Sequence, residues 1–504
     1  MESLSPEESS QYTRLVSRIQ RSLASLFTGQ SLKAKAIRGG AWLGSGSVAE
    51  QAARFFRNLI LVRLLIPAAF GTAALVTSTG LILQAFTEVG VREALVQSRR
   101  GSEYDFMNAT WWMAFARALF VCMLVFITAP WVASFYGNSE LIPLLRVAIL
   151  GLVLEGAMSA RAYVALKEMR FSRWALAAYG GSVLGILITI ALCFYIRNVW
   201  ALVLGTVSES LARCILSYAL CPWIPSFRVK KEHFRELFRY SRGVVGLPIL
   251  MLIFLRTDVF VLGKLVPASQ LGLYTMGISI GQVPAVFVSN LLYHISLSTL
   301  SQIQDDKLRT NRVVLKVTSL VVAFGAPALA FTFFCGSSVL ALVYGKPYAA
   351  MGGALFFALC TGMISIVNAQ LTSVFYSAGE PALHRRCVAT MAVLMVLLVY
   401  PFSKWLGPQG AQLAALISVA AGFGLQLERV RIFTDLRVAS YVKVLIRSAA
   451  PSLAVIIVCL AARLLPAWSR PLPSIGFGAV GCLLAYALGC IMLMRRVAEG
   501  SPAG

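Results

Sequence analysis

Charged residues are scarce in this sequence, and acidic residues are scarcer than basic ones. Charged residues make up 13% of the 504, whereas about 25% is usual in a soluble domain. Hydrophobic residues make up 58%, and the mean hydropathy is +0.76. This composition excludes a soluble globular protein and predicts an all-α protein that crosses a membrane many times.

Motifs typical of metal proteins and enzymes are also missing. The ten cysteines are scattered, mostly in apolar stretches, and no two have the spacing of a metal or redox site. The sequence contains no nucleophile triad and no phosphate-binding loop. Its loops are short, and the longest cytoplasmic one runs from about Cys221 to Arg239. We therefore expect a transporter rather than an enzyme, with no metal and no cofactor.

The net charge of +24 has a topological explanation. Lys and Arg gather in the cytoplasmic loops of membrane proteins, so we expect no nucleic-acid partner. Residues 1–38 contain no apolar core of a signal peptide. They are predicted to be a cytoplasmic tail, either a mobile basic segment or an interfacial amphipathic helix that presents Leu15, Ile19 and Leu23 to the membrane.

Apolar stretches predict fourteen membrane spans, with twelve as the alternative, if each crossing takes about 20 residues. Their approximate positions are 40–64, 70–95, 107–130, 140–161, 174–196, 199–220, 240–264, 270–297, 313–336, 351–378, 385–405, 410–430, 443–465 and 474–494. Alternate loops hold most basic residues, for example Arg99 with Arg100 and Lys230 with Lys231. Both termini are therefore predicted to be cytoplasmic.

Two pairs of similar segments indicate an internal repeat. LVRLLIPAAFGTAALVTS (61–78) resembles VLGKLVPASQLGLYTMGIS (261–279), and FYGNSELIPLLRVAILGLV (135–153) resembles VYGKPYAAMGGALFFALCT (343–361). The offset spans six helices, an even number, so the repeats are parallel and a substrate site is expected between them.

The repeat divides the chain into lobes and flanking segments. The predicted units are a tail (1–38), a first lobe of spans one to six (39–220), a basic linker (221–239), a second lobe of spans seven to twelve (240–430), two further spans (431–496) and a second cytoplasmic tail (497–504).

Charged residues inside the predicted spans are the candidates for function. A charge near the middle of a membrane helix costs roughly 2.5 to 3.5 kcal/mol, and such residues usually face the bundle interior or a wet cavity. Arginines suit phosphate because the guanidinium stays charged and binds two oxygens at once. The candidates for a cationic substrate cavity are Arg54, Arg57, Arg117 and Arg256, and those for gating or ion coupling are Glu50, Glu88 and Asp258.

Other roles for embedded charges remain open. Asp258 and an arginine such as Arg54 can also form a structural ion pair between spans, and a gating pair is itself an ion pair. Glu155 is a second-tier cavity candidate. For Arg213, near the end of span six, reaching to the membrane interface is the favoured interpretation.

Two stretches of the sequence resemble those of a known family. The stretch WLGSGSVAEQAARFFRNLILVRLLIPAAFGTAALV and the pattern D-x-x-x-L-G-x-L-x-P-x-x-x-L-G-x-Y from Asp258 to Tyr274 are similar to the polysaccharide transporter family of the multidrug, oligosaccharidyl-lipid and polysaccharide exporter superfamily. More narrowly, the chain resembles Wzx-type lipid-linked oligosaccharide flippases of the bacterial inner membrane.

That resemblance implies a V-shaped, two-lobed transporter that moves undecaprenyl-pyrophosphate-linked sugars to the periplasmic leaflet by alternating access. It also implies an ion gradient or the membrane potential as the energy source. Arginines in the first and seventh helices of the family match Arg54, Arg57 and Arg256 by position. The implied partners are the lipid-linked oligosaccharide, membrane lipids, H⁺ or Na⁺, and a polymerase or glycosyltransferase.

Two alternative functions fit the sequence less well than a flippase does. A drug or cation antiporter of the same superfamily would favour acidic residues in the cavity, whereas arginines dominate here. A polytopic glycosyltransferase or polymer ligase would need a longer periplasmic loop than any in this sequence. The identity of the sugar does not follow from the sequence.

Overall fold

The computed structural model describes residues 32–86, 90–227, 232–237, 246–303 and 306–498, and every regular element in these ranges is a helix. This agrees with the predicted all-α class. Glu88 and the segment considered for an interfacial helix around Leu15 to Leu23 lie outside the described residues.

The helices of the first half extend to residue 220. They are α2 (Leu32–Leu64), α3 (Pro67–Phe86), α4 (Val91–Gln97), α5 (Tyr104–Tyr136), α6 (Leu141–Ala148), α7 (Leu150–Gly156), α8 (Ala160–Lys167), α9 (Phe171–Ala175), the π-helical turn η1 (Leu176–Gly180), α10 (Gly181–Ile196) and α11 (Val199–Leu220).

The helices of the second half begin at residue 247. They are α13 (Leu247–Leu265), α14 (Ala268–Gln302), α15 (Lys307–Val343), η2 (Lys346–Met351), α16 (Gly352–Ser377), α17 (Pro381–Leu406), α18 (Pro408–Thr434), α19 (Val438–Ala449), α20 (Ser452–Ala462), η3 (Pro466–Ser469) and α21 (Pro471–Ala498).

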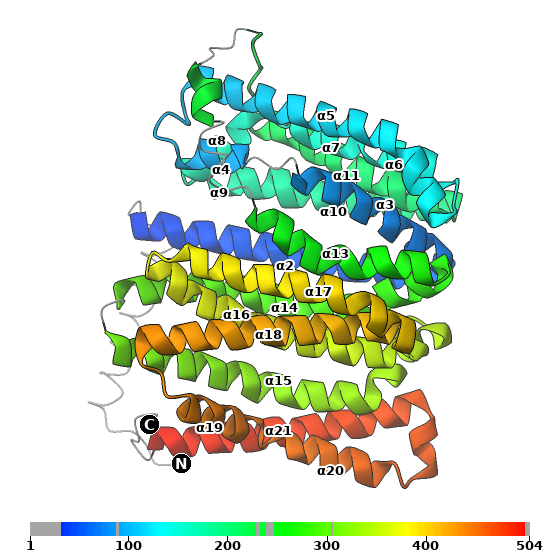
Figure 1. Ribbon diagram of the computed structural model, residues 1–504, viewed down its shortest axis with the longest axis vertical. Coiled ribbons are helices and arrows are strands. Elements are labelled where there is room, and N and C mark those ends of the chain that lie inside the picture. The colour runs from blue at the N-terminus through cyan, green and yellow to red at the C-terminus, as the bar shows by residue number, and fades with distance from the viewer. Residues whose placement is uncertain (1–31, 87–89, 228–231, 238–245, 304–305, 499–504) are drawn as a thin grey trace, which may run out of the picture.

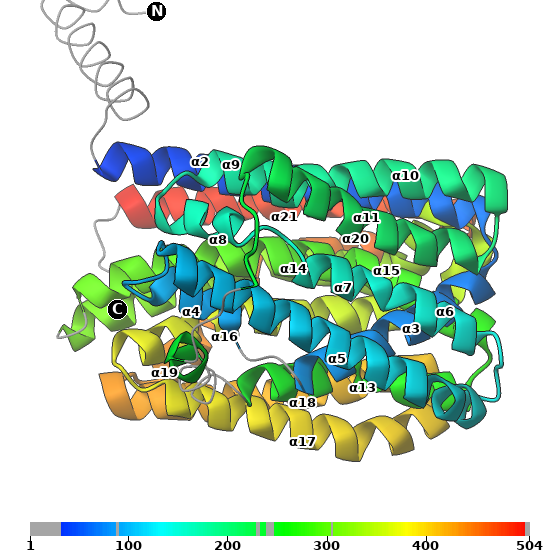
Figure 2. The same ribbon diagram turned by 90° about the horizontal axis from the view of Figure 1, so that it is seen from above.

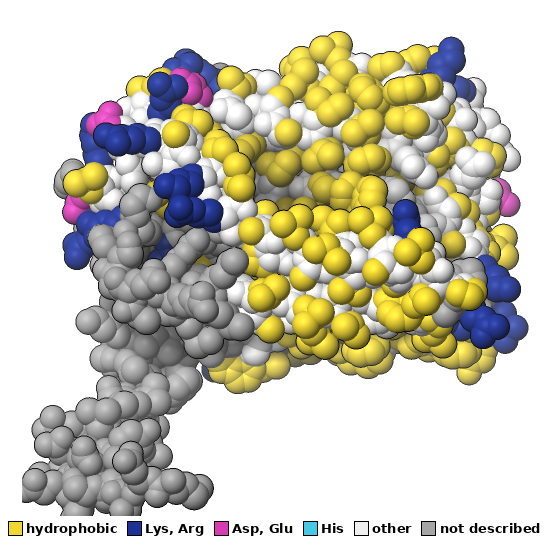
Figure 3. All heavy atoms as spheres, turned by 90° about the horizontal axis from the view of Figure 1, so that it is seen from below, with side chains coloured by type: hydrophobic (Ala, Val, Ile, Leu, Met, Phe, Trp, Pro, Cys, Tyr) yellow, Lys and Arg dark blue, Asp and Glu magenta, His cyan; other side chains and the backbone are white. Residues whose placement is uncertain are grey.

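The helices run side by side and are stacked along the long axis of the molecule (Figure 1). The helices α5 to α11 lie at one end of the stack, α19 to α21 lie at the other, and α2 begins on the same side on which α21 ends (Figure 1). Seen from above, α2 and α10 form one side and α17 and α18 the opposite side (Figure 2). Hydrophobic side chains cover the middle of the face in Figure 3, while Lys and Arg gather toward its two ends. A multi-pass membrane protein has such an apolar belt.

The number of spans is resolved only in part. Within the described ranges, nine helices are long and apolar enough to cross a membrane, and two bent helix pairs raise this number to eleven. In addition, α2, α13 and α14 coincide with the predicted first, seventh and eighth spans. The total of fourteen therefore stays a prediction.

Two predicted spans are bent rather than straight. The helices of the predicted fourth span bend by 53° between Gly156 and Ala160, and those of the predicted thirteenth bend by 42° before Ser452. At the first bend, Ser217 Oγ accepts a hydrogen bond from Ser159 N at 3.0 Å, and Tyr218 donates one to Ala157 O at 2.8 Å. The end of α11 thus binds backbone groups that the bend removes from the helix, as a membrane interior requires.

The two halves contact each other where the repeat begins. α3 packs chiefly against α14 and α13 of the second half. A Cβ atom on Gly71 would lie 1.9 Å from Ala268 O, and one on Gly272 would lie 1.8 Å from Pro67 O. Equivalent positions that contact each other reciprocally are the mark of a twofold relation. The backbones of α3 and α14 therefore meet at a pseudo-twofold axis.

The second pair of similar segments also has matching structure. In each segment a long helix ends at a Tyr-Gly pair, in which Gly137 has φ +67° and Gly345 has φ +106°. Glycine adopts these positive angles without the steric cost that other residues incur. A continuous hydrophobic core joins the halves through Leu61, Phe70 and Leu271.

We expect Gly71→Ala to destabilise the protein, because the added methyl group would overlap a backbone carbonyl of α14. The cost of such overpacking is about 1–3 kcal/mol. The matched control is Gly80→Ala, also in α3, where nothing lies within 4 Å of the added atom. Thermal unfolding of the purified protein in detergent should show a lower midpoint for Gly71→Ala only. Equal midpoints for the two variants would contradict the close approach.

Candidate functional site

Among the described helices of 18 or more residues, α2 is the most polar, and it packs against α9, η1 and α10. It carries Glu50, Arg54, Arg57 and Asn58 within nine residues, and all four side chains are half-buried. Their spacing of three or four residues places Glu50, Arg54 and Arg57 close together along the helix. The structure separates the two arginines into different environments.

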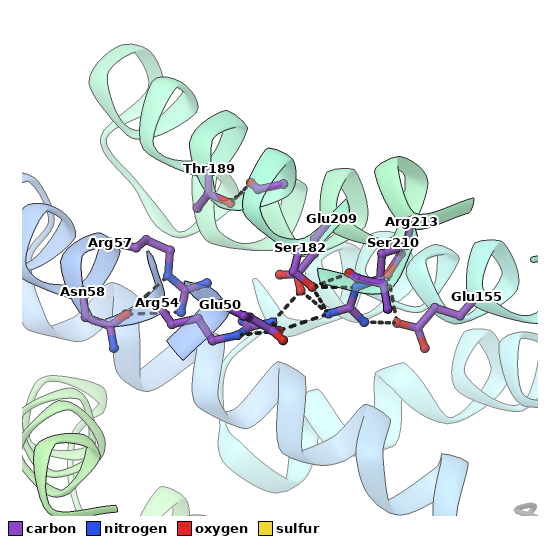
Figure 4. Close-up of polar contacts among 12 residues, drawn as sticks. Glu50, Arg54, Arg57, Asn58, Glu155, Ser182, Thr189, Glu209, Ser210 and Arg213 are labelled. Atoms are coloured by element: carbon purple, nitrogen blue, oxygen red, sulfur yellow. Dashed lines mark hydrogen bonds and ion pairs between the residues drawn. The ribbon is translucent and has the colours of Figure 1, made fainter. Parts of the chain in front are cut away.

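Arg54 is held by two carboxylates. Its Nη2 atom lies 2.8 Å from Glu50 Oε1 and 2.5 Å from Glu209 Oε1 of α11. The Glu209 side chain is only 10% exposed and also forms an ion pair with Arg213, one turn further along α11 (Figure 4). The positive charge of Arg54 is therefore balanced within the first half.

The ion pairs continue from Arg213 into the interior of the first half. Arg213 Nη1 lies 3.4 Å from Glu155 Oε1 of α7, and the Nε and Nη2 atoms of Arg213 donate to Ser182 Oγ of α10 at 3.0 and 2.7 Å (Figure 4). Three carboxylates and two guanidinium groups thus form one network, which we call the ion-pair network: Glu50, Arg54, Glu155, Glu209 and Arg213. Its formal charge is −1.

Two glycines of α10 let α11 come close enough to build this network. A Cβ atom on Gly185 would lie 2.3 Å from Glu209 Cα, and one on Gly181 would lie 2.7 Å from Arg213 Cα. Small residues four apart on a membrane helix allow such close backbone approach. The backbone of α11 therefore contacts α10 at the two positions that carry the charges.

Arg57 has a different environment. Its Nε and Nη2 atoms donate to Asn58 Oδ1 at 3.3 and 3.2 Å, and it forms no ion pair with any carboxylate in the described ranges. It lines a cavity of about 190 Å³ between the halves, which we call the central cavity. The walls are Gln51, Arg54, Phe55, Arg57 and Asn58 of α2, Ser279, Ile280, Gln282 and Val283 of α14, and Tyr344 after α15.

The central cavity suits a small anionic group. Arg57 supplies an uncompensated positive charge, and the amide and hydroxyl groups of Gln51, Gln282 and Tyr344 supply neutral hydrogen-bond donors. Ser279 Oγ and Tyr344 OH lie 3.3 Å apart, so the wall from the second half is itself hydrogen-bonded. Charge-assisted hydrogen bonds from arginine to phosphate are about twice as strong as neutral ones.

Two other arginines from the sequence prediction lie elsewhere. Arg256 on α13 and Arg117 on α5 are half-buried, and neither lines the central cavity. The expected grouping of Arg54, Arg57, Arg117 and Arg256 in one cavity is therefore seen only for Arg54 and Arg57.

Asp258 is buried within the second half. Its Oδ2 atom accepts a hydrogen bond from Tyr274 of α14 at 2.5 Å, and Gln412 of α18 donates to the same tyrosine oxygen at 2.6 Å. The structural ion pair with Arg54 considered from the sequence is not formed, because Arg54 pairs with Glu50 and Glu209. Asp258 thus links α13 to α14 and α18 through neutral partners.

The position of Arg213 near the end of span six predicts that it reaches the membrane interface, and Glu209 is not among the site residues expected from the sequence. Glu209 and Arg213 have the same order and spacing as Glu50 and Arg54, glutamate first and arginine four residues later. This shared pattern was the available signal. It indicates two helices whose charges are able to pair with each other.

We expect Glu209→Gln to weaken the ion-pair contact between α2 and α11 and so to destabilise the protein. The substitution removes the carboxylate that both Arg54 and Arg213 contact. The loss should be at most about 3 kcal/mol, the lower end for a broken buried pair, because the two arginine side chains are 30% and 26% exposed. Thermal unfolding in detergent measures the effect.

The control for this variant is Glu428→Gln, which breaks the exposed pair with Arg431 on α18. Exposed pairs contribute about 0–1 kcal/mol, so this variant should unfold like the wild type. A Glu209→Gln midpoint no lower than that of the control would contradict the structural role of the network.

The chain is similar to proteins of polysaccharide biosynthesis. The succinoglycan biosynthesis transport protein ExoT of Rhizobium meliloti is 22% identical over 59% of this chain and 60% of its own length. The amylovoran biosynthesis protein AmsL of Erwinia amylovora is 22% identical over 59% of this chain and 77% of its own length. The chain therefore matches less than two thirds of ExoT.

Solved structures share the fold. The lipid II flippase MurJ, in an inward closed conformation, has a TM-score of 0.70 at 12% identity and covers 90% of this chain and 99% of its own. An inward-facing multidrug resistance MATE family transporter of the MOP superfamily has a TM-score of 0.53 at 17% identity and covers 76% of this chain and 96% of its own.

These likenesses agree with the predicted two-lobed transporter architecture, and at such identities they show the fold alone. The sequence evidence goes further, since the family model described as polysaccharide biosynthesis protein matches residues 60–352. That match spans more than half of the chain, and the protein is a member of this polysaccharide biosynthesis protein family.

Proposed function

We propose that this protein is a flippase that moves lipid-linked saccharide units, of the undecaprenyl-pyrophosphate type, across the bacterial inner membrane for surface polysaccharide synthesis. The observation that carries the proposal is Arg57, which lines the cavity between the two halves and has no carboxylate partner among the residues that the structure describes. The family membership and the names of the relatives support the substrate class.

Arg57 rather than Arg54 is the proposed ligand of the pyrophosphate. Two carboxylates already hold Arg54, so a phosphate would have to compete with Glu50 and Glu209 for it. Arg57, by contrast, would exchange its hydrogen bonds to the neutral side chain of Asn58 for bonds to the phosphate. In this assignment Glu50 balances Arg54 when the cavity is empty, and Arg54 positions α2.

The proposed transport cycle widens the central cavity. Its volume of about 190 Å³ is below the roughly 300–1,000 Å³ of ordinary small-molecule pockets, so it admits a phosphate group but not a saccharide. If both termini are cytoplasmic, α2 ends and α3 begins on the periplasmic side of the membrane. In this proposal the contact between Gly71 and Gly272 closes the periplasmic end of the central cavity. The substrate then enters from the cytoplasmic side, and the halves rotate about this contact to release it.

The coupling ion is part of the proposal, with Glu50 and the ion-pair network as its site. Glu50 shares both of its guanidinium partners, Arg54 and Arg213, with Glu209, so its carboxylate is the one that we assign to an additional H⁺ or Na⁺. Asp258 is the weaker candidate, because hydrogen bonds already link its side chain to Tyr274 and its own helix. A drug or cation antiporter is disfavoured by the uncompensated charge of Arg57.

We expect Arg57→Ala to reduce export of the saccharide roughly tenfold or more, since a hydrogen bond to a charged group contributes about 1.5–3 kcal/mol. The measurement is the amount of lipid-linked saccharide that accumulates in the cytoplasmic leaflet of cells carrying the variant. Arg57→Lys should retain part of the activity, because lysine keeps the charge but loses the planar fork.

Two further arginines serve as comparisons for this experiment. Arg431→Ala changes an exposed residue of α18 and should leave export unchanged. Arg256→Ala changes a half-buried arginine outside the central cavity and should have a smaller effect than Arg57→Ala. Undiminished export by a correctly inserted Arg57→Ala protein would refute the proposed site.

A further inference from the structure

An open groove lies beside the central cavity, on the outside of the boundary between the halves. Its walls are Leu59, Ile60, Arg63 and Leu64 of α2, Phe194 of α10, and Leu342 and Val343 of α15. We call it the seam groove, because α2 and α10 belong to the first half and α15 to the second. Its volume is about 570 Å³, and all of its lining residues except Arg63 are apolar.

The seam groove and the central cavity meet on two helices. On α2, Arg57 lines the cavity, and Ile60 and Leu64 line the groove. These residues are three and seven positions apart, so they follow one face of the helix. On α15, Leu342 and Val343 of the groove directly precede Tyr344 of the cavity. The cationic central cavity and the apolar seam groove are therefore neighbours.

The groove opens to the surroundings of the protein. Phe194 is 53% exposed and Leu342 is 45% exposed, and in a membrane-spanning bundle such apolar side chains face hydrocarbon. Arg63 is exposed and forms no hydrogen bond or ion pair within the described ranges. The groove thus faces the hydrocarbon around the protein and lies next to the polar space between its halves.

A lipid-linked substrate needs such an arrangement. Its pyrophosphate requires cations and hydrogen-bond donors. Its polyprenyl chain is apolar, so its free energy rises wherever it enters a polar cavity. The chain therefore has to leave the cavity through an apolar opening close to the phosphate site. We propose that the seam groove holds the first isoprene units of the substrate's polyprenyl chain while the pyrophosphate lies at Arg57, an assignment that rests on the proposed function.

Photo-crosslinking tests where the chain lies. The full-length protein in lipid nanodiscs is incubated with undecaprenol that carries a diazirine near its hydroxyl end, and the labelled positions are found by mass spectrometry. We expect labels at Phe194 and Leu342, reduced by excess unlabelled undecaprenol but not by phosphatidylglycerol. Labels spread over the apolar surface, or equal reduction by phosphatidylglycerol, would mean that bulk lipid fills the groove.

Binding to matched variants tests the role of the groove. Phe194→Ser and Leu342→Ser should raise the Kd for undecaprenyl pyrophosphate about tenfold and leave the Kd for inorganic pyrophosphate within twofold of wild type. The controls are Leu187→Ser on α10 and Phe333→Ser on α15, two exposed apolar residues outside the groove. Unchanged binding of the lipid by the groove variants, or equal loss of both ligands, would overturn the assignment.

The two proposals fail in different ways. If inorganic pyrophosphate does not bind the wild-type protein, the proposed function is wrong, and the labelling by undecaprenol still decides the groove. If inorganic pyrophosphate binds at Arg57 while undecaprenol labels other surfaces, the groove assignment alone is wrong.

Discussion

A charged side chain inside a membrane bundle is costly unless it finds a partner, and this constraint organises the first half of the protein. Glu209 contacts both Arg54 and Arg213, and Glu50 lies 3.7 Å from Arg213, so two carboxylates tie α2 to α11. Gly181 and Gly185 bring α10 against the backbone of α11 at the same positions. With Arg54 neutralised in this way, Arg57 is the arginine of α2 whose charge remains available at the central cavity.

The second half is built differently around the same axis. The two halves meet at Gly71 and Gly272, whose backbones touch reciprocally. Beyond this contact the chemistry diverges. The first half holds an ion-pair network, whereas Asp258 of the second half accepts a hydrogen bond from the neutral side chain of Tyr274, whose oxygen in turn accepts one from Gln412. The pseudo-symmetric frame therefore carries an asymmetric site, with the cation on α2 and neutral hydrogen-bonding groups on α14 and at the end of α15.

The helical architecture was predictable because apolar stretches and short loops leave few alternatives. The repeat was predictable because Pro67 and Pro267 begin equivalent turns. The partners of the charged residues were not, because pairing depends on which helices touch, and the Gly181 and Gly185 contact that sets this is invisible in a single sequence. Arg54 and Arg57 therefore looked equivalent, although Glu209 distinguishes them, and Arg256 was expected in a cavity that it does not line.

In the proposed function, Arg57 binds the anionic head of a lipid-linked substrate. The most direct measurement is the affinity of the purified protein for inorganic pyrophosphate, compared between wild type, Arg57→Ala and Arg54→Ala, each checked for correct folding. We predict that Arg57→Ala abolishes the binding and that Arg54→Ala weakens it less. Equal binding by wild type and Arg57→Ala would contradict the claim.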